Sequence, residues 1–66
     1  MNNVIKIAVD AMGGDGSPKK IIDGIIHHYH NNKEIFYQIF GNHEQIINLI
    51  DKKLPNDVFE IIHTTE

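Results

Sequence analysis

The chain has 66 residues, no cysteine and a net charge of −3 with its five histidines counted as neutral. This length allows one small domain at most, and the lack of cysteine excludes both the disulfide-rich secreted class and thiolate metal sites. All six basic residues are lysines, and because nucleic-acid binding needs clustered cations and favours arginine, the composition argues against a nucleic-acid partner.

Membrane and export signals are missing from the sequence. No apolar run approaches the roughly 18 residues that a transmembrane helix needs. The start of the chain, residues 1–3, lacks the basic stretch of a signal peptide. The sequence therefore predicts a cytoplasmic protein without a transmembrane segment.

The first half of the chain predicts a strand, a glycine-rich turn and a helix. Residues 4–9 are nearly all apolar and β-branched, which is typical of a strand buried on both faces of a parallel sheet. Ser17 and Pro18 indicate a helix start, with Ser17 as the N-cap and Pro18 as the first helical residue. A glycine within the helix, Gly24, predicts a close contact between helix and sheet. One helix face carries the apolar residues Ile21, Ile22, Ile25, Ile26 and Tyr29.

The second half predicts a strand over residues 34–40, a helix and a third strand over residues 58–62. Asn42, three residues before Gln45, is typical of a helix N-cap. The helix is expected to run to Leu54, with Lys52 and Lys53 in its last turn. It is expected to bury Ile46, Ile47, Ile50 and Leu54.

The element order β-α-β-α-β predicts an α/β fold with a parallel sheet, one half of a doubly wound domain. A sheet that ends at its third strand has an open edge and at least one face without cover. We therefore expect residues 1–66 to be the front part of a single larger domain.

The stretch Asp10–Pro18 is the strongest functional candidate, because three glycines in four positions suit a turn that needs positive φ or close approach. A strand that leads through such a turn into a helix can hold an anion. The spacing matches neither the Walker loop nor the Rossmann fingerprint, whose third glycine is replaced by Lys19. Asp10 and Asp15 could order the turn, hold a cation or accept a substrate hydroxyl, and a turn without any ligand is the alternative.

The histidines allow a metal hypothesis and a simpler one. His27, His28 and His30 do not share one helix face and lack an i,i+4 pair, so the spacing favours surface histidines over a metal site. His63 follows the third strand, at the sheet edge where α/β folds bind ligands. Its alternative is an exposed residue that starts a loop.

The letters of the glycine-rich stretch resemble a known family. Residues 7–15, Ile-Ala-Val-Asp-Ala-Met-Gly-Gly-Asp, followed by Pro18, are similar to the opening of the bacterial phosphate acyltransferases of the PlsX type. The helix with Gly24, the strand that ends in Gly41 and the segment that ends in His63 agree in order and spacing. Asn42 and Thr64 depart from residues common in that family.

The resemblance implies a function, a fold and partners. The expected reaction converts acyl-acyl carrier protein and inorganic phosphate into acyl phosphate for phospholipid synthesis, with no cofactor. The expected fold is a three-layer parallel-sheet fold of the isocitrate-dehydrogenase and phosphotransacetylase type, in a homodimeric cytoplasmic enzyme whose full-length form could associate with membranes. No catalytic acid or base is implied. The residues implied at the phosphate or acyl-phosphate site are Asp10, Gly13, Gly14, Asp15 and His63.

Two other functions compete with this one. The chain could be an inactive, truncated or split-gene remnant of such an enzyme, because its sheet would lack cover. An independent nucleotide-binding module is disfavoured by the missing third glycine and by Phe40-Gly41-Asn42, which has no acidic residue at the end of the second strand.

Overall fold

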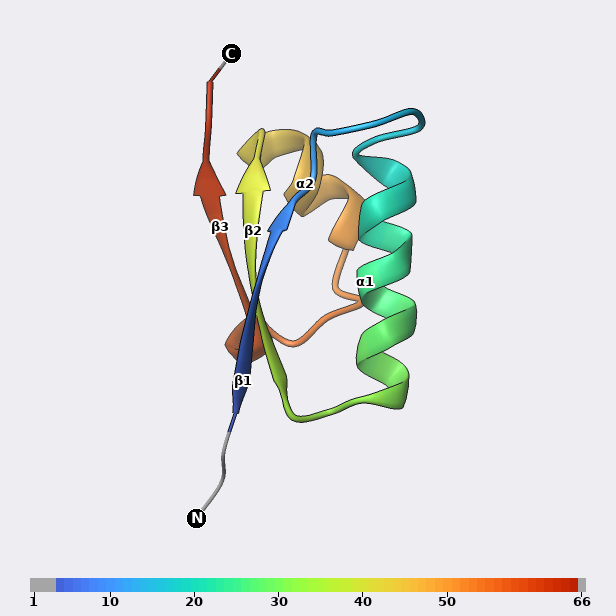
Figure 1. The fold of residues 1–66 in the computed structure, drawn as a ribbon, viewed down its shortest axis with the longest axis vertical. Coiled ribbons are helices and arrows are strands. Elements are labelled where there is room, and N and C mark those ends of the chain that lie inside the picture. Colours follow the sequence, from blue (N-terminus) through green and yellow to red (C-terminus); the bar gives the residue numbers. More distant parts are fainter. Residues whose placement is uncertain (1–3, 66) are drawn as a thin grey trace.

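The computed structural model describes residues 4–65 and consists of a three-stranded parallel sheet with two α-helices (Figure 1). The elements in chain order are β1 (Ile5–Asp10), α1 (Lys19–Asn31), β2 (Ile35–Gly41), α2 (His43–Ile50), the 3-10 turn η1 (Asn56–Val58) and β3 (Phe59–His63). The strand order is β1-β2-β3, with both neighbouring pairs parallel. The predicted α/β alternation is confirmed.

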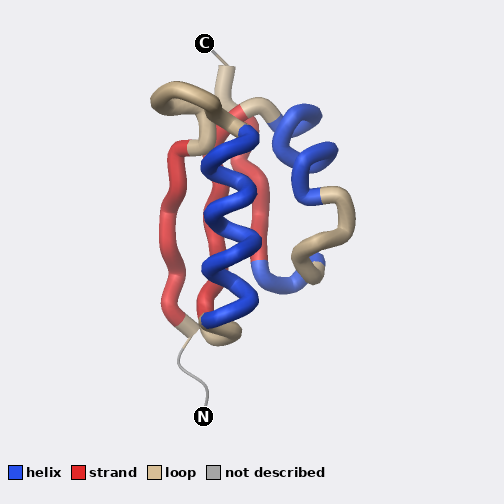
Figure 2. The backbone as a smooth tube through the Cα atoms, turned by 90° about the vertical axis from the view of Figure 1, so that its right-hand side faces the viewer, coloured by secondary structure: helices blue, strands red, loops and turns tan. Residues whose placement is uncertain are grey.

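Both helices lie on the same face of the sheet (Figures 1 and 2). This follows from right-handed crossovers that add each strand on the same side of the previous one. The core between the layers is made by Ala11, Ile22, Ile25, Tyr37, Ile39, Ile46, Ile50 and Leu54. Neither α-helix in this part of the chain is long and apolar enough to cross a membrane.

The other face of the sheet is bare among residues 4–65, and this corrects one prediction. The first strand was expected to be buried on both faces, but Lys6, Ala8 and Asp10 are exposed while Ile7 and Val9 are half-buried. Within the described part of the chain, β1 is also an edge strand whose one neighbour is β2. Its apolar run is typical of a strand that is covered on both faces, but residues 4–65 cover only one face of β1.

The start of α1 differs from the prediction. Pro18 is the N-cap and makes no side-chain capping bond, and the helix begins at Lys19. The Ser17 hydroxyl donates instead to the carbonyl of Gly13. The prediction of Ser17 as the N-cap was therefore wrong, because the turn before the helix takes up its hydroxyl.

The start of α2 was predicted and its end was not. Asn42 is the N-cap, and its Oδ1 accepts a hydrogen bond from the Gln45 backbone N–H at 3.0 Å. The helix ends at Ile50, because Asp51 and Lys52 adopt left-handed conformations with φ of 43° and 66°. Lys52 and Lys53 thus lie beyond the helix, and Leu54 reaches the core from the loop that follows.

Two further packing predictions were wrong. Ile47, expected in the core, is 37% exposed, since it lies about 100° around the helix from buried Ile46. A Cβ on Gly24 would meet no atom within 4 Å, so no close contact with the sheet explains this glycine.

His28 holds the hydroxyl of a buried tyrosine. The His28 Nδ1 and Tyr37 Oη atoms are 2.7 Å apart, and the two rings meet edge to face with centroids 6.1 Å apart. Burial raises the pKa of Tyr37 above its ordinary 10.0, and nearby Tyr29 adds to this. Among residues 4–65, no three histidine or carboxylate side chains gather in a way that could bind a metal ion.

Two glycine substitutions are expected to have opposite effects on stability. Gly24→Ala should raise the free energy of unfolding by about 0.5–1 kcal/mol. An alanine Cβ meets no atom there, and alanine loses less conformational entropy than glycine when it enters a helix. Gly41→Ala should lower it by about 1–3 kcal/mol, because its Cβ would lie 2.8 Å from Ile46 Cδ1. Urea denaturation of both variants measures this, and equal signs would contradict the packing at Gly41.

Stability should fall in alkaline solution because of Tyr37. Because the pKa of Tyr37 is higher in the folded state, the folded state holds the phenol proton at a pH where the unfolded state has lost it. The contribution of Tyr37 to the free energy of unfolding is therefore complete below about pH 10 and is lost as the pH rises through the folded-state pKa. Tyr37→Phe should remove this part of the pH dependence and cost about 1 kcal/mol near neutral pH. Urea denaturation across this pH range is the measurement. An unchanged alkaline slope in Tyr37→Phe would show that Tyr37 is not responsible.

Candidate functional site

The glycine-rich corner, residues 10–18, connects the end of β1 to the start of α1 at the carboxyl edge of the sheet (Figure 1). Its first residues continue the sheet, because the Ala11 N–H donates to the Phe40 carbonyl at 2.9 Å. Ala11 is fully buried. The corner therefore starts from a fixed position beside β2.

Met12 packs over the end of β2. A Cβ built on Gly41 would lie 2.9 Å from Met12 Cγ and 2.8 Å from Ile46 Cδ1. The missing side chain of Gly41 thus lets the corner and α2 close over the same backbone position. Neither the contact nor the role of Met12 was predicted, since only the tertiary structure brings these residues together.

Two polar side chains order the backbone of the corner. Asp10 Oδ1 accepts a hydrogen bond from the Met12 N–H at 3.0 Å, and Ser17 binds the Gly13 carbonyl. A Cβ on Gly13 would lie 3.6 Å from Asp10 Oδ2, so this carboxylate lies close beside the glycine. Of the functions left open for Asp10, ordering the turn is the one that the hydrogen bond supports.

The glycines of the corner make a conformation that other residues would strain. Gly14 and Gly16 have φ of 88° and 81°, in the region that favours glycine. None of the hydrogen bonds among residues 4–65 uses the N–H groups of Gly13 or Gly14. These exposed donors could hold an anion.

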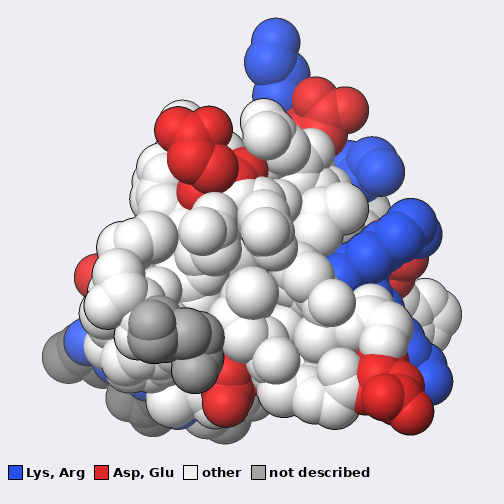
Figure 3. Space-filling model, turned by 90° about the horizontal axis from the view of Figure 1, so that it is seen from above, with Lys and Arg blue, Asp and Glu red and all other residues white. Residues whose placement is uncertain are grey.

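The charged residues of the corner are mainly exposed. Asp15 is exposed and makes no hydrogen bond with another described residue. Lys19 pairs with Asp23 at 2.7 Å in solvent, and the methylene groups of Lys20 lie near Gly16. Seen from this edge, the surface is mostly uncharged, with lysines mainly on the helix side (Figure 3).

His63 is at the same edge but on the other side of β2. It ends β3 and pairs with Gly41, while Asp10 is on β1. Two strand spacings, roughly 10 Å, therefore separate the backbones of Asp10 and His63. The Nδ1 atom of His63 accepts a hydrogen bond from the His43 N–H at 3.0 Å. The fold thus brings four of the candidate phosphate-site residues, Asp10, Gly13, Gly14 and Asp15, together in the corner. The fifth, His63, lies against α2 on the other side of β2.

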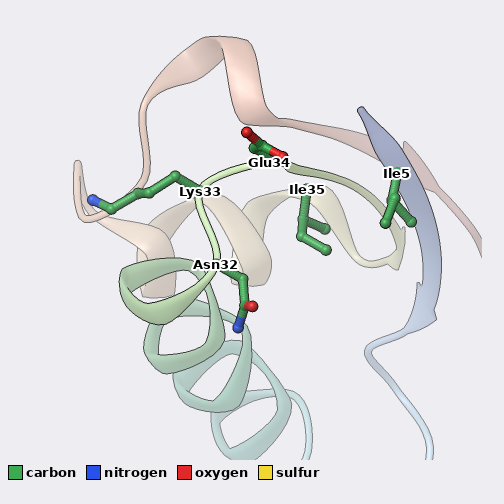
Figure 4. Close-up of a pocket in the computed structure, with 5 residues that line it drawn as sticks. All are labelled: Ile5, Asn32, Lys33, Glu34 and Ile35. Atoms are coloured by element: carbon green, nitrogen blue, oxygen red, sulfur yellow. The ribbon is translucent and has the colours of Figure 1, made fainter. Parts of the chain in front are cut away.

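An open pocket lies at the opposite end of the sheet. It has a volume of about 350 Å³ and is lined by Ile5, Asn32, Lys33, Glu34 and Ile35 (Figure 4). The Lys33 side chain points away from the two isoleucines, and its ammonium lies 4.5 Å from the centre of the Tyr29 ring. This cavity brings together no set of groups with an evident catalytic function.

The hydrogen bond of Asp10 predicts which substitution the corner tolerates. Asp10→Ala should lower the free energy of unfolding by about 0.5–1.5 kcal/mol, because it removes the acceptor for the Met12 N–H. Asp10→Asn keeps an oxygen in that position and should stay close to the unchanged protein. Urea denaturation compares the two, and equal stability of both variants would contradict a structural role for this hydrogen bond.

Comparison with known proteins identifies the family. A family model described as "Fatty acid synthesis protein" matches residues 5–66. A phosphate acyltransferase from Pelagibacter ubique is 65% identical over 66 residues, which are 100% of this chain and 20% of that protein. Phosphate acyltransferases from Onion yellows phytoplasma and Streptococcus uberis are 41% and 39% identical over 63 and 61 residues, each covering 92% of this chain and 17% of the relative. The chain spans about a fifth of the length of these relatives. Since the match includes the whole glycine-rich corner and His63, the chain belongs to the fatty acid synthesis protein family.

Proposed function

We propose that the protein acts as a phosphate acyltransferase, which forms acyl phosphate from acyl-acyl carrier protein and inorganic phosphate. The 65% identity to a protein named phosphate acyltransferase, extending over all 66 residues, carries this proposal. The fatty acid synthesis family agrees with an acyl substrate. The product would enter phospholipid synthesis.

In the proposed reaction, a phosphate oxygen attacks the carbonyl carbon of the thioester. The C–O bond forms, negative charge develops on the carbonyl oxygen, and the C–S bond then breaks to release the carrier thiolate, which takes up a proton. This route needs no covalent nucleophile from the protein. The protein has to position phosphate and stabilise the developing charge.

The corner is suited to positioning phosphate. The N–H groups of Gly13 and Gly14 donate to no residue between 4 and 65 and could donate to phosphate oxygens. Asp10 and Asp15 would repel a bare anion, but a carboxylate can accept a hydrogen bond from the protonated oxygen of hydrogen phosphate. We therefore assign Asp10, Gly13, Gly14 and Asp15 to the phosphate site, with His63 as a further contact and no residue assigned as general acid or base.

The partners and the state of the enzyme follow from the same proposal. Acyl carrier protein and inorganic phosphate are the substrates, the active form is a homodimer, and the cytoplasm is the compartment. The competing proposal is a catalytically inactive remnant. Among residues 4–65, half-buried Phe36, Phe40 and Ile62 lie on the bare sheet face without a covering layer.

The proposal is tested by incubating the protein, at its natural length, with acyl-acyl carrier protein and phosphate and trapping acyl phosphate with hydroxylamine. Formation of the hydroxamate is expected, and Asp15→Asn should lower kcat/KM by about 10-fold or more through loss of a charged hydrogen bond. Residues 1–66 tested alone are expected to be inactive. Asp23→Asn, which changes an exposed carboxylate outside the corner, is the matched control. Failure of the natural-length protein to form acyl phosphate would favour the inactive remnant.

A further inference from the structure

His63 is held in one orientation although it is exposed. Its Nδ1 atom accepts a hydrogen bond from the backbone N–H of His43, the first residue of α2, at 3.0 Å. The backbone on both sides is also held, because His63 pairs with Gly41 in the sheet and the Thr64 N–H donates to the Gly41 carbonyl at 3.0 Å. The ring therefore links the end of β3 to the first turn of α2.

This hydrogen bond decides which ring nitrogen of His63 carries the proton. A nitrogen that accepts from an N–H is itself unprotonated, so in the neutral ring the proton is on Nε2. The Nε2–H group makes no hydrogen bond with any residue between 4 and 65. The nearby Gln45 N–H is already bound by Asn42. The His63 Nε2–H is thus exposed and not used by the described residues, so a ligand can reach it.

The position of this donor fits the proposed phosphate site. The carboxyl ends of parallel strands form the edge at which α/β folds bind their ligands. The glycine-rich corner reaches this edge from β1, and His63 reaches it from β3. Met12 packs over Gly41 between them. A substrate at this edge would have the backbone donors of the corner on one side and His63 on the other, across the end of β2.

We propose that His63 binds an anionic oxygen of the phosphate substrate through Nε2–H, and that the backbone N–H of His43 fixes the ring in the tautomer that can donate. This inference rests on the proposed function. His43 acts as a positioning residue through its main chain, whereas His63 touches the substrate.

The positioning step can be tested by removing one backbone N–H. Proline has none, and it is accepted at the first position of a helix, which His43 occupies. The preceding Asn42 has φ −75° and ψ 116°, which is the extended conformation required before proline. His43→Ala changes the same side chain but keeps the N–H, so it is the matched comparison.

The measurement for this step is the ¹⁵N NMR spectrum of labelled histidine rings in mildly alkaline solution. In the unchanged protein and in His43→Ala, Nδ1 of His63 should give the signal of an unprotonated nitrogen and Nε2 that of a protonated one. In His43→Pro the two signals should move toward each other as both tautomers become populated. Unaltered signals in His43→Pro would overturn the positioning role.

The binding step is tested by His63→Asn in the protein at its natural length. The asparagine Oδ1 can still accept from the His43 N–H, but the Nε2–H donor is gone. The KM for inorganic phosphate should rise by about 10- to 100-fold, the factor expected for a lost hydrogen bond to a charged group, with little change in kcat. His43→Pro should raise the same KM relative to His43→Ala.

The outcomes separate this inference from the function on which it rests. If the unchanged protein forms acyl phosphate and His63→Asn leaves the KM for phosphate unaltered, the binding role of His63 is wrong and the proposed function stands. If the unchanged protein forms none, both the function and the binding role fail. The ring signals then still decide whether His43 fixes the tautomer.

Discussion

The close approach at Gly41 is the contact on which the arrangement of the carboxyl edge depends. Met12 from the corner and Ile46 from α2 both occupy the space that a side chain at residue 41 would fill. Because interiors are densely packed, this space cannot hold a Cβ as well without displacing one of them. Gly41 thereby allows the corner, the end of β2 and the start of α2 to lie next to one another.

The parallel topology then gathers the functional candidates. All three strands end at one edge, so the loops that follow β1 and β2 and the end of β3 meet there without any long connection (Figure 1). His63 adds a side-chain link between β3 and α2. The elements around the edge are therefore tied to one another by backbone pairing, by one imidazole and by packing at Gly41.

Two polar side chains of the corner hold its own backbone in place. Asp10 and Ser17 each bind a backbone group within the corner. Gly14 and Gly16 supply positive φ, which lets the chain turn back toward α1. The backbone N–H groups of Gly13 and Gly14 donate to none of residues 4–65, and the proposed phosphate site uses them as main-chain donors.

Local chemistry made much of this fold predictable. The change from a β-branched run to a helical apolar period marks β1 and α1, and Asn42 caps α2 as expected from its spacing to Gln45. The prediction for Ser17 was wrong because a hydroxyl at a helix start can bind either the helix or the preceding turn, and here it binds the Gly13 carbonyl.

The sequence by itself determined the order of the elements, the glycine-rich corner and the family resemblance, all of which depend on residues close together in the chain. Only the tertiary structure decided the contact of Met12 with Gly41 and the hydrogen bond from His43 to His63. These contacts join residues 20 or more positions apart. Periodicity and capping patterns carry no information over that distance, because packing between elements selects which side chains meet.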